Sequence, residues 1–128
     1  MGNIDDKDSG YAKKGWLRMF SYAWAGLIHC FVTQRNMKVH VAVGAGTLIL
    51  AWQVGVSRVE MMILLLTIAG VLSAEIVNTA IEKVVDLVSP DVHPLAKAAK
   101  DMSAGAVLVM AITAVLVGGL LFWRQLFG

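Results

Sequence analysis

The chain has 128 residues, of which 58% are apolar and 16% are charged, and its net charge is +2. Soluble domains contain about 45–50% apolar and about 25% charged residues. Too few polar side chains remain here to cover a soluble globule of this size, which has a high surface-to-volume ratio. The composition excludes an ordinary soluble domain, and the small net charge gives no sign of a nucleic-acid-binding protein. We therefore expect a single membrane-embedded domain over residues 1–128.

The N-terminal part of the chain is polar and then amphipathic. Residues 1–10 carry acidic side chains and no apolar run, so we expect a flexible segment without a signal peptide. A helix is predicted over 11–34, with Lys13, Lys14 and Arg18 on its polar side. Its apolar side repeats at helical spacing through Trp16, Leu17, Phe20, Trp24, Leu27, Ile28 and Phe31. Aromatic residues opposite basic ones are typical of a helix lying in the membrane interface.

Three stretches without acidic, Lys or Arg residues follow, at 39–57, 61–74 and 102–123. A helix needs about 20 residues to cross the hydrocarbon core of a bilayer. The first and third stretches are long enough by themselves. The second is long enough only if it continues past Glu75 and carries acidic residues into or near the membrane. The predicted transmembrane helices are 37–56, 60–88 and 94–124.

Glycine is common in the predicted spans. Small residues allow transmembrane helices to approach each other closely. We expect helix contacts at Gly44, Gly46, Gly70, Gly105, Gly118 and Gly119.

Lys and Arg are distributed unevenly around the spans. Nine of the 11 precede the first span or lie between the second and third, whereas Arg58 and Arg124 fall on the opposite side. Because cytoplasmic loops are enriched in Lys and Arg, the N-terminus and the 87–101 segment are predicted to be cytoplasmic. The short turn at 57–60 is then external.

Four polar side chains form a stripe along the second span: Glu75, Asn78, Glu82 and Asp86. At the helical rotation and rise per residue they share one face over about 16 Å. An acid at the bilayer centre costs about 2.5–3.5 kcal/mol, so a positive partner is expected. A divalent cation and Lys100 are the two candidates. Three spans are too few to shelter this stripe from lipid, so we expect subunits to associate.

The stripe is compatible with more than one chemistry. A buried acid such as Glu75 can act as a general base towards a hydroxyl, and further acids can bind Mg²⁺ for phosphoryl transfer to a lipid alcohol. A proton-coupled transporter also requires one deep Glu. No P-loop and no protein-kinase motif is present. His29 and His40 are interpreted as interfacial or packing residues. The acidic stripe by itself therefore leaves two functions open, a lipid kinase and a proton-coupled transporter.

One long motif resembles a known family. The pattern Glu75-x-x-Asn78-x-x-x-Glu82-x-x-x-Asp86, followed by His93-Pro-Leu-Ala-Lys-Ala-Ala-Lys100-Asp101, resembles the prokaryotic diacylglycerol kinase and undecaprenol kinase family. The resemblance covers nearly the whole chain. It implies an all-α integral membrane kinase of the bacterial inner membrane, with a surface helix and three transmembrane helices. It also implies ATP as co-substrate, Mg²⁺ as cofactor, and a homotrimer whose active sites are shared between subunits on the cytoplasmic side.

The resemblance also implies roles for individual residues. Glu75 matches the catalytic base and contacts the lipid substrate together with Asp101. Glu82 and Gln34 match the metal-binding positions. The nucleotide-binding positions are Arg18, Tyr22, Gln34, Asn78, Glu82, Asp86, Asp91, Val92, His93, Lys100 and Asp101.

One position departs from the family pattern. The second metal carboxylate of the family is usually a Glu before Arg-Asn, and Gln34 stands there in this chain. An amide has one carbonyl oxygen and no charge, so it is a weaker Mg²⁺ ligand.

The lipid acceptor is predicted from the same family resemblance. The Arg35-Asn36 segment and the stretch leading to Lys100 are more similar to the undecaprenol-using branch. The alternative acceptor is diacylglycerol, whose product would be phosphatidic acid, and helical periodicity cannot separate the two.

Overall fold

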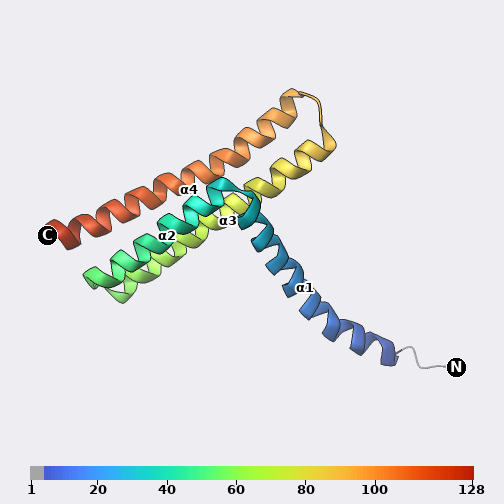
Figure 1. Ribbon diagram of the computed structural model, residues 1–128, viewed down its shortest axis with the longest axis horizontal. Helices are drawn as coiled ribbons and strands as arrows, with labels where there is room; N and C mark the ends of the chain where they lie inside the picture. The colour runs from blue at the N-terminus through green and yellow to red at the C-terminus, as the bar shows by residue number, and fades with distance from the viewer. Residues whose placement is uncertain (1–4) are drawn as a thin grey trace. The chain divides into compact units, whose positions relative to one another are not determined.

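The computed structural model describes the backbone of residues 5–128 and the side chains of residues 15–128. All regular structure in this part of the chain is helical, in the order α1 (Asp5–Thr33), α2 (Arg35–Val54), α3 (Arg58–Val88) and α4 (Pro94–Phe127). The chain divides into two units, residues 1–33 and 34–128. Figure 1 shows both, with α2, α3 and α4 in the second unit.

The first unit consists of α1. Its helix begins at Asp5, so residues 5–10, expected to be flexible, are helical. Large apolar side chains on α1, including Trp16, Phe20 and Trp24, are exposed. The interfacial position of this helix stays a prediction.

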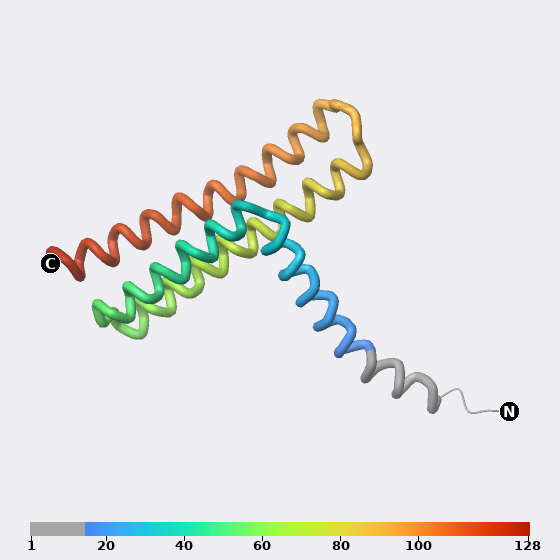
Figure 2. The backbone as a smooth tube through the Cα atoms, viewed as in Figure 1, coloured from blue at the N-terminus to red at the C-terminus, as the bar shows by residue number. Residues whose placement is uncertain are grey.

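The second unit is a three-helix arrangement in which α3 packs against both α2 and α4. All three helices are long and apolar enough to cross a membrane, which confirms the three predicted spans. The 31 residues of α3 and the 34 of α4 exceed the number needed to cross the core. Both helices are therefore longer than a single perpendicular crossing requires, and Figure 2 traces their connection through the 89–93 loop.

Local sequence signals set the helix ends in this unit. α2 stops at Gly55, whose φ of 72° lies in the left-handed region that favours glycine. α3 starts with a capping box in which the Ser57 hydroxyl accepts from the Glu60 amide while Glu60 accepts from the Ser57 amide. α4 starts with Pro94 in its first turn. A missing amide hydrogen is harmless at that position.

Only two of the expected glycine contacts are formed within the described second unit. A Cβ placed at Gly44 would lie 2.9 Å from the Cγ2 of Ile68, so α2 and α3 approach closely there. At Gly70 the neighbour is the flexible end of Met110 on α4. At the other four positions an added Cβ would meet no atom of the same subunit within 4 Å, so these glycines make no close helix contact within one chain: Gly46, Gly105, Gly118 and Gly119.

The three-helix unit has a small core and a largely apolar exterior. Ala51, Leu64 and Leu121 form a buried cluster with one residue from each helix. Many larger apolar side chains, such as Leu66, Leu116 and Leu120, remain exposed. This distribution suits a bundle whose exterior contacts lipid chains.

Candidate active site

Glu75 is the deepest acidic side chain of α3. It is 2% exposed, and it is the largest side chain among the most fully buried residues. The nearest basic group is on α2, where the Nε2 of His40 lies 3.9 Å from the Oε2 of Glu75. The expectation that His40 serves only packing or an interfacial position is therefore incomplete, because it faces the deepest acid of the stripe.

Asn78 forms the next part of the stripe and connects α3 to α4. Its Nδ2 donates to the Oε1 of Glu82 at 3.3 Å, and its Oδ1 accepts from the Ser103 hydroxyl at 2.7 Å. The Ser103 hydroxyl also lies 2.9 Å from the carbonyl oxygen of Lys100. Because the carbonyl of the Asn78 amide faces Ser103, its amino group is directed at Glu82.

Asp86 marks the exposed end of the stripe. Its Oδ1 accepts from the Nζ of Lys100 at 2.6 Å, which joins α3 and α4. One turn away, Lys97 pairs with Asp101 along α4. Four charged groups therefore lie at the end of the helices nearest the 89–93 loop.

Burial decreases steadily along the stripe. Glu75 and Asn78 are buried, Glu82 is half-buried and Asp86 is exposed. One subunit thus shelters the deep half of the stripe. The expectation that three spans are too few for this is wrong for Glu75 and Asn78, which are buried within one subunit beside His40 of α2 and Ser103 of α4.

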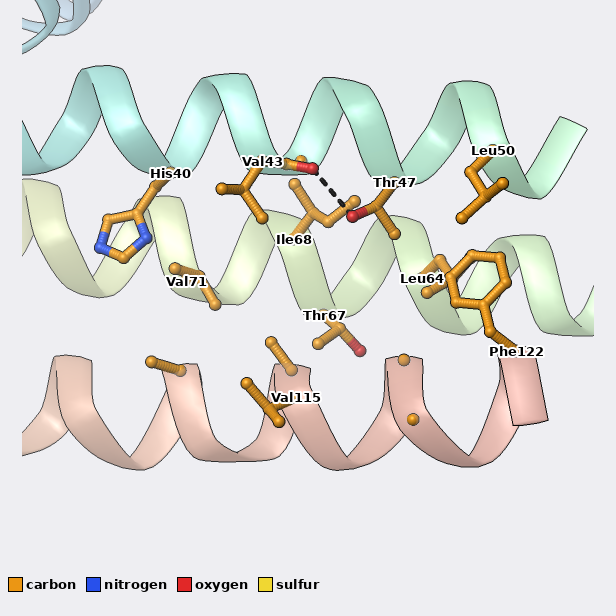
Figure 3. A pocket seen from close by; sticks show the side chains of 15 residues that line it. His40, Val43, Thr47, Leu50, Leu64, Thr67, Ile68, Val71, Val115 and Phe122 are labelled. Carbon is orange, nitrogen blue, oxygen red and sulfur yellow. Dashed lines mark hydrogen bonds between the residues drawn. The ribbon is translucent and has the colours of Figure 1, made fainter.

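An apolar cavity of about 450 Å³ lies between the three helices. Figure 3 shows His40 and Val71 at one end of the residues lining it, and Leu50 and Phe122 at the other. On α3 the lining residues are Leu64, Thr67, Ile68 and Val71. Glu75 is one helical turn beyond Val71, so α3 carries the cavity wall, the buried acid and the polar stripe in succession.

Several predicted site residues lie outside this cluster. Arg18 and Tyr22 are on α1, in the other unit. Gln34 is the N-cap residue of α2 and makes no side-chain capping hydrogen bond. Their predicted roles stay predictions.

The predicted nucleotide-binding loop has a structural feature that the motif did not reveal. Asp91 and Val92 are exposed between α3 and α4. His93 is the N-cap of α4, where its Nδ1 accepts from the amide of Leu95 at 3.1 Å. The Nδ1 atom is occupied by this capping contact. The second polar atom of the imidazole ring is Nε2.

The described side chains also bear on the predicted Mg²⁺ site. Within residues 15–128, no three His, Cys, Asp or Glu side chains gather closely enough to hold a metal ion. Protein Mg²⁺ sites often supply only one or two carboxylates, with substrate phosphates and water completing the shell. Glu82 fits that pattern, since Asn78 bonds only one of its oxygens and the side chain is half-buried.

Sequence reasoning missed two contributors to the cluster, His40 and Ser103. Both are single polar residues on apolar helix faces, and their importance depends on which side chains of the neighbouring helix they meet. Their positions in the charge-poor parts of α2 and α4 were the only available signal.

The fold and the cluster together define an integral membrane protein with a buried acidic site inside a helical bundle. Comparison with known proteins narrows this class. The profile of the prokaryotic diacylglycerol kinase family matches residues 21–122. The chain belongs to the prokaryotic diacylglycerol kinase family, and it is a membrane lipid kinase.

Individual relatives support this assignment. An undecaprenol kinase of Bacillus subtilis is 41% identical over 123 residues, which cover 96% of this chain and 100% of the relative. A diacylglycerol kinase of Synechocystis is 47% identical over 103 residues, covering 80% of this chain and 59% of the relative. A diacylglycerol kinase of Escherichia coli is 32% identical over 110 residues, covering 85% and 89%.

Proposed function

We propose that the protein transfers the γ-phosphoryl group of ATP to the hydroxyl of undecaprenol, with Glu75 as the general base. The observation that carries the proposal is the order of residues on α3. Cavity-lining apolar residues end at Val71, the buried carboxylate of Glu75 follows, and polar residues continue to Asp86. A lipid alcohol has the same order of properties, with a hydrocarbon chain, a hydroxyl and then the phosphate it receives.

The acceptor hydroxyl would meet Glu75 at the end of the apolar cavity. Glu75 accepts the hydroxyl proton as the oxygen forms a bond to the γ-phosphorus. The bond between that phosphorus and the bridging oxygen of ATP breaks, and ADP leaves. Because Glu75 is 2% exposed, bulk water competes poorly with the lipid hydroxyl for the phosphoryl group.

The polar end of the stripe supplies the nucleotide contacts. Lys100 is the cation best placed for phosphate, since it extends towards α3 from the end nearest the loop. Phosphoryl transfer depends mainly on positioning and on neutralising the charge of the phosphates. The remaining proposed nucleotide contacts are Arg18, Tyr22, Gln34, Asn78, Glu82, Asp86, Asp91, Val92, His93 and Asp101.

Mg²⁺ fits the residues present. Glu82 would be the main protein ligand, with Gln34 as a weaker second one. When bound, the ion neutralises phosphate charge and orients the γ-phosphoryl group. The hydrogen bond from Asn78 holds the Glu82 carboxylate in place for this task.

Undecaprenol is the proposed acceptor because the Bacillus subtilis undecaprenol kinase matches this chain over its entire length. Diacylglycerol is the alternative, and the Synechocystis diacylglycerol kinase has the higher identity over a shorter region. Both acceptors present a primary hydroxyl attached to a hydrocarbon portion, so the same site serves either.

Orientation and assembly form part of the proposal. The excess of Lys and Arg near the N-terminus and the 89–93 loop supports a cytoplasmic site in a bacterial inner membrane. A homotrimer with shared active sites would cover the half-buried and exposed part of the stripe, namely Glu82 and Asp86. The buried Glu75 needs no partner for its shelter.

The direct test is phosphate transfer by the purified protein in detergent. Labelled ATP is supplied with undecaprenol and, in parallel, with diacylglycerol. We expect faster transfer to undecaprenol, and a loss of about 100-fold or more for Glu75→Gln. Glu60→Gln is the matched control, because it neutralises an acid at the other end of the same helix.

Each part of the proposal can fail separately. Full activity of Glu75→Gln would show that Glu75 is not the base. Faster transfer to diacylglycerol would reverse the order of acceptors. Ion-gradient-driven transport by the reconstituted protein, without any phosphate transfer, would instead favour the proton-coupled transporter.

A further inference from the structure

His40 and Glu75 face each other across the contact between α2 and α3. The imidazole Nε2 lies 3.9 Å from the carboxylate Oε2, and the two side chains are 23% and 3% exposed. Figure 3 shows the His40 ring extending from α2 towards α3 at one end of the cavity-lining residues. His40 therefore borders both the apolar cavity and the proposed base.

No other basic side chain among the described residues comes within 4.0 Å of this carboxylate. On α4, Lys97 and Lys100 are paired with Asp101 and Asp86, and Arg124 is in the last turn. The basic residues of α3 are Arg58, in its first turn, and the exposed Lys83. The other basic residues of α2, Arg35 and Lys38, are exposed. His40 is thus the one basic group of the described part that acts on Glu75 at short range.

A buried carboxylate requires a polar partner, because burial without one is costly. An imidazole N–H provides such a partner without introducing a permanent charge. At 3.9 Å the separation exceeds the usual 2.7–3.2 Å of an N–H···O hydrogen bond. The pair is therefore an electrostatic contact and not a hydrogen bond in this structure, and it leaves the carboxylate oxygen open to the proton of an incoming hydroxyl.

We infer that His40 is a positioning residue for the lipid-kinase reaction: it holds the Glu75 carboxylate towards the end of the apolar cavity where the acceptor hydroxyl arrives. The inference rests on the proposed role of Glu75 as the base. It adds a function for a residue of α2, the helix that contributes no other described polar contact to Glu75.

The test compares three single variants with the wild type, in the same detergent assay and at saturating lipid. His40→Leu removes the imidazole but keeps an apolar side chain of similar size next to the cavity. Its kcat should fall by about ten-fold to 100-fold, with little change in the KM for ATP. His40→Gln retains an N–H donor and should recover most of that loss. Gln53→Leu makes the matched polar-to-apolar change elsewhere on α2 and should retain the wild-type rate.

A double variant separates positioning from general damage to the protein. If His40 acts through Glu75, adding His40→Leu to Glu75→Gln should not lower the residual rate further. Wild-type kcat in His40→Leu, or equal loss in His40→Leu and His40→Gln, would overturn the inference. Those results would leave the proposed function intact so long as Glu75→Gln is inactive. Full activity of Glu75→Gln would instead overturn the proposed function itself.

Discussion

The Nζ of Lys100 lies 2.6 Å from the Oδ1 of Asp86, and this ion pair joins α4 to α3 beside their connecting loop. Both side chains are open to solvent, at 38% and 65% exposure. Exposed ion pairs contribute little to stability. The position of Lys100 is therefore better explained by a ligand that takes over its charge than by a need to hold the helices together.

Replacing Lys100 tests this explanation. Lys100→Met should lower kcat/KM for ATP by about ten-fold or more, because a charge-assisted contact to phosphate is lost. The melting temperature should change little, since the pair is exposed. Steady-state kinetics over a range of ATP concentrations and a thermal inactivation curve check both expectations.

Lys83→Met is the matched control for Lys100→Met. Lys83 is an exposed cation of α3 that lies off the polar stripe. It should retain the wild-type kcat/KM. An equal loss in both variants would show that overall charge, and not contact with the nucleotide, determines the effect.

Ser103 provides a second prediction through its bond to Asn78. Ser103→Ala removes the donor to the Asn78 carbonyl, which should destabilise the protein by about 1 kcal/mol. The Asn78 amide is then free to rotate, so Glu82 loses a fixed orientation. The Mg²⁺ concentration for half-maximal rate should rise by about ten-fold.

The control for Ser103→Ala is Thr113→Ala on the same helix. The Thr113 hydroxyl donates only to the carbonyl oxygen of Val109, within α4. Its loss should leave the Mg²⁺ dependence unchanged. If Ser103→Ala behaves in the same way, the hydrogen-bonded chain through Asn78 does not position Glu82.

Gln34 is the position at which the chain departs from its family, and it supplies a third prediction. Gln34→Glu should raise the activity or lower the Mg²⁺ requirement, because a carboxylate binds Mg²⁺ more strongly than an amide. Titrations of Mg²⁺ at fixed ATP compare the variant with the wild type. Asn36→Asp adds the same charge nearby on α2 and should not reproduce the effect. Superimposable titrations of Gln34→Glu and the wild type would exclude a metal contact at this position.

The sequence correctly predicted the features that depend on a single helix, namely the positions of the spans and the residues that share one helix face. Charge-free stretches placed the three spans, and the 3.6-residue period correctly put Glu75, Asn78, Glu82 and Asp86 on one face. Lys100 was foreseen as a partner of the stripe because a buried row of acids requires a cation. Its pairing with Asp86 agrees with that reasoning.

The sequence was less informative where two helices must be aligned with each other. Periodicity shows which residues share a face, but not how far neighbouring helices rotate or slide against each other. That relative position decides that His40 meets Glu75 and that Ser103 meets Asn78. It also decides that Gly44 and Gly70 contact a neighbour while Gly46 does not.

Gly44 gives a prediction for the packing of α2 against α3. Gly44→Ala would place a Cβ 2.9 Å from the Cγ2 of Ile68, closer than carbon atoms normally approach. Ile68 is β-branched and stiff at χ1, so its methyl group cannot easily move aside. Overpacking of this kind costs about 1–3 kcal/mol. The midpoint of unfolding by a denaturing detergent should therefore shift to a lower concentration.

Gly46→Ala separates this steric effect from the helix propensity of alanine. A Cβ at Gly46 meets no atom within 4 Å, so only the backbone effect remains. Alanine is favoured over glycine in a helix by about 1 kcal/mol, and Gly46→Ala should be as stable as the wild type or more so. Opposite shifts of the two midpoints are expected because residues 44 and 46 lie on different sides of α2. Equal midpoints would mean that α2 and α3 do not pack closely at Gly44, and the contact between His40 and Glu75 one turn away would then lose its structural support.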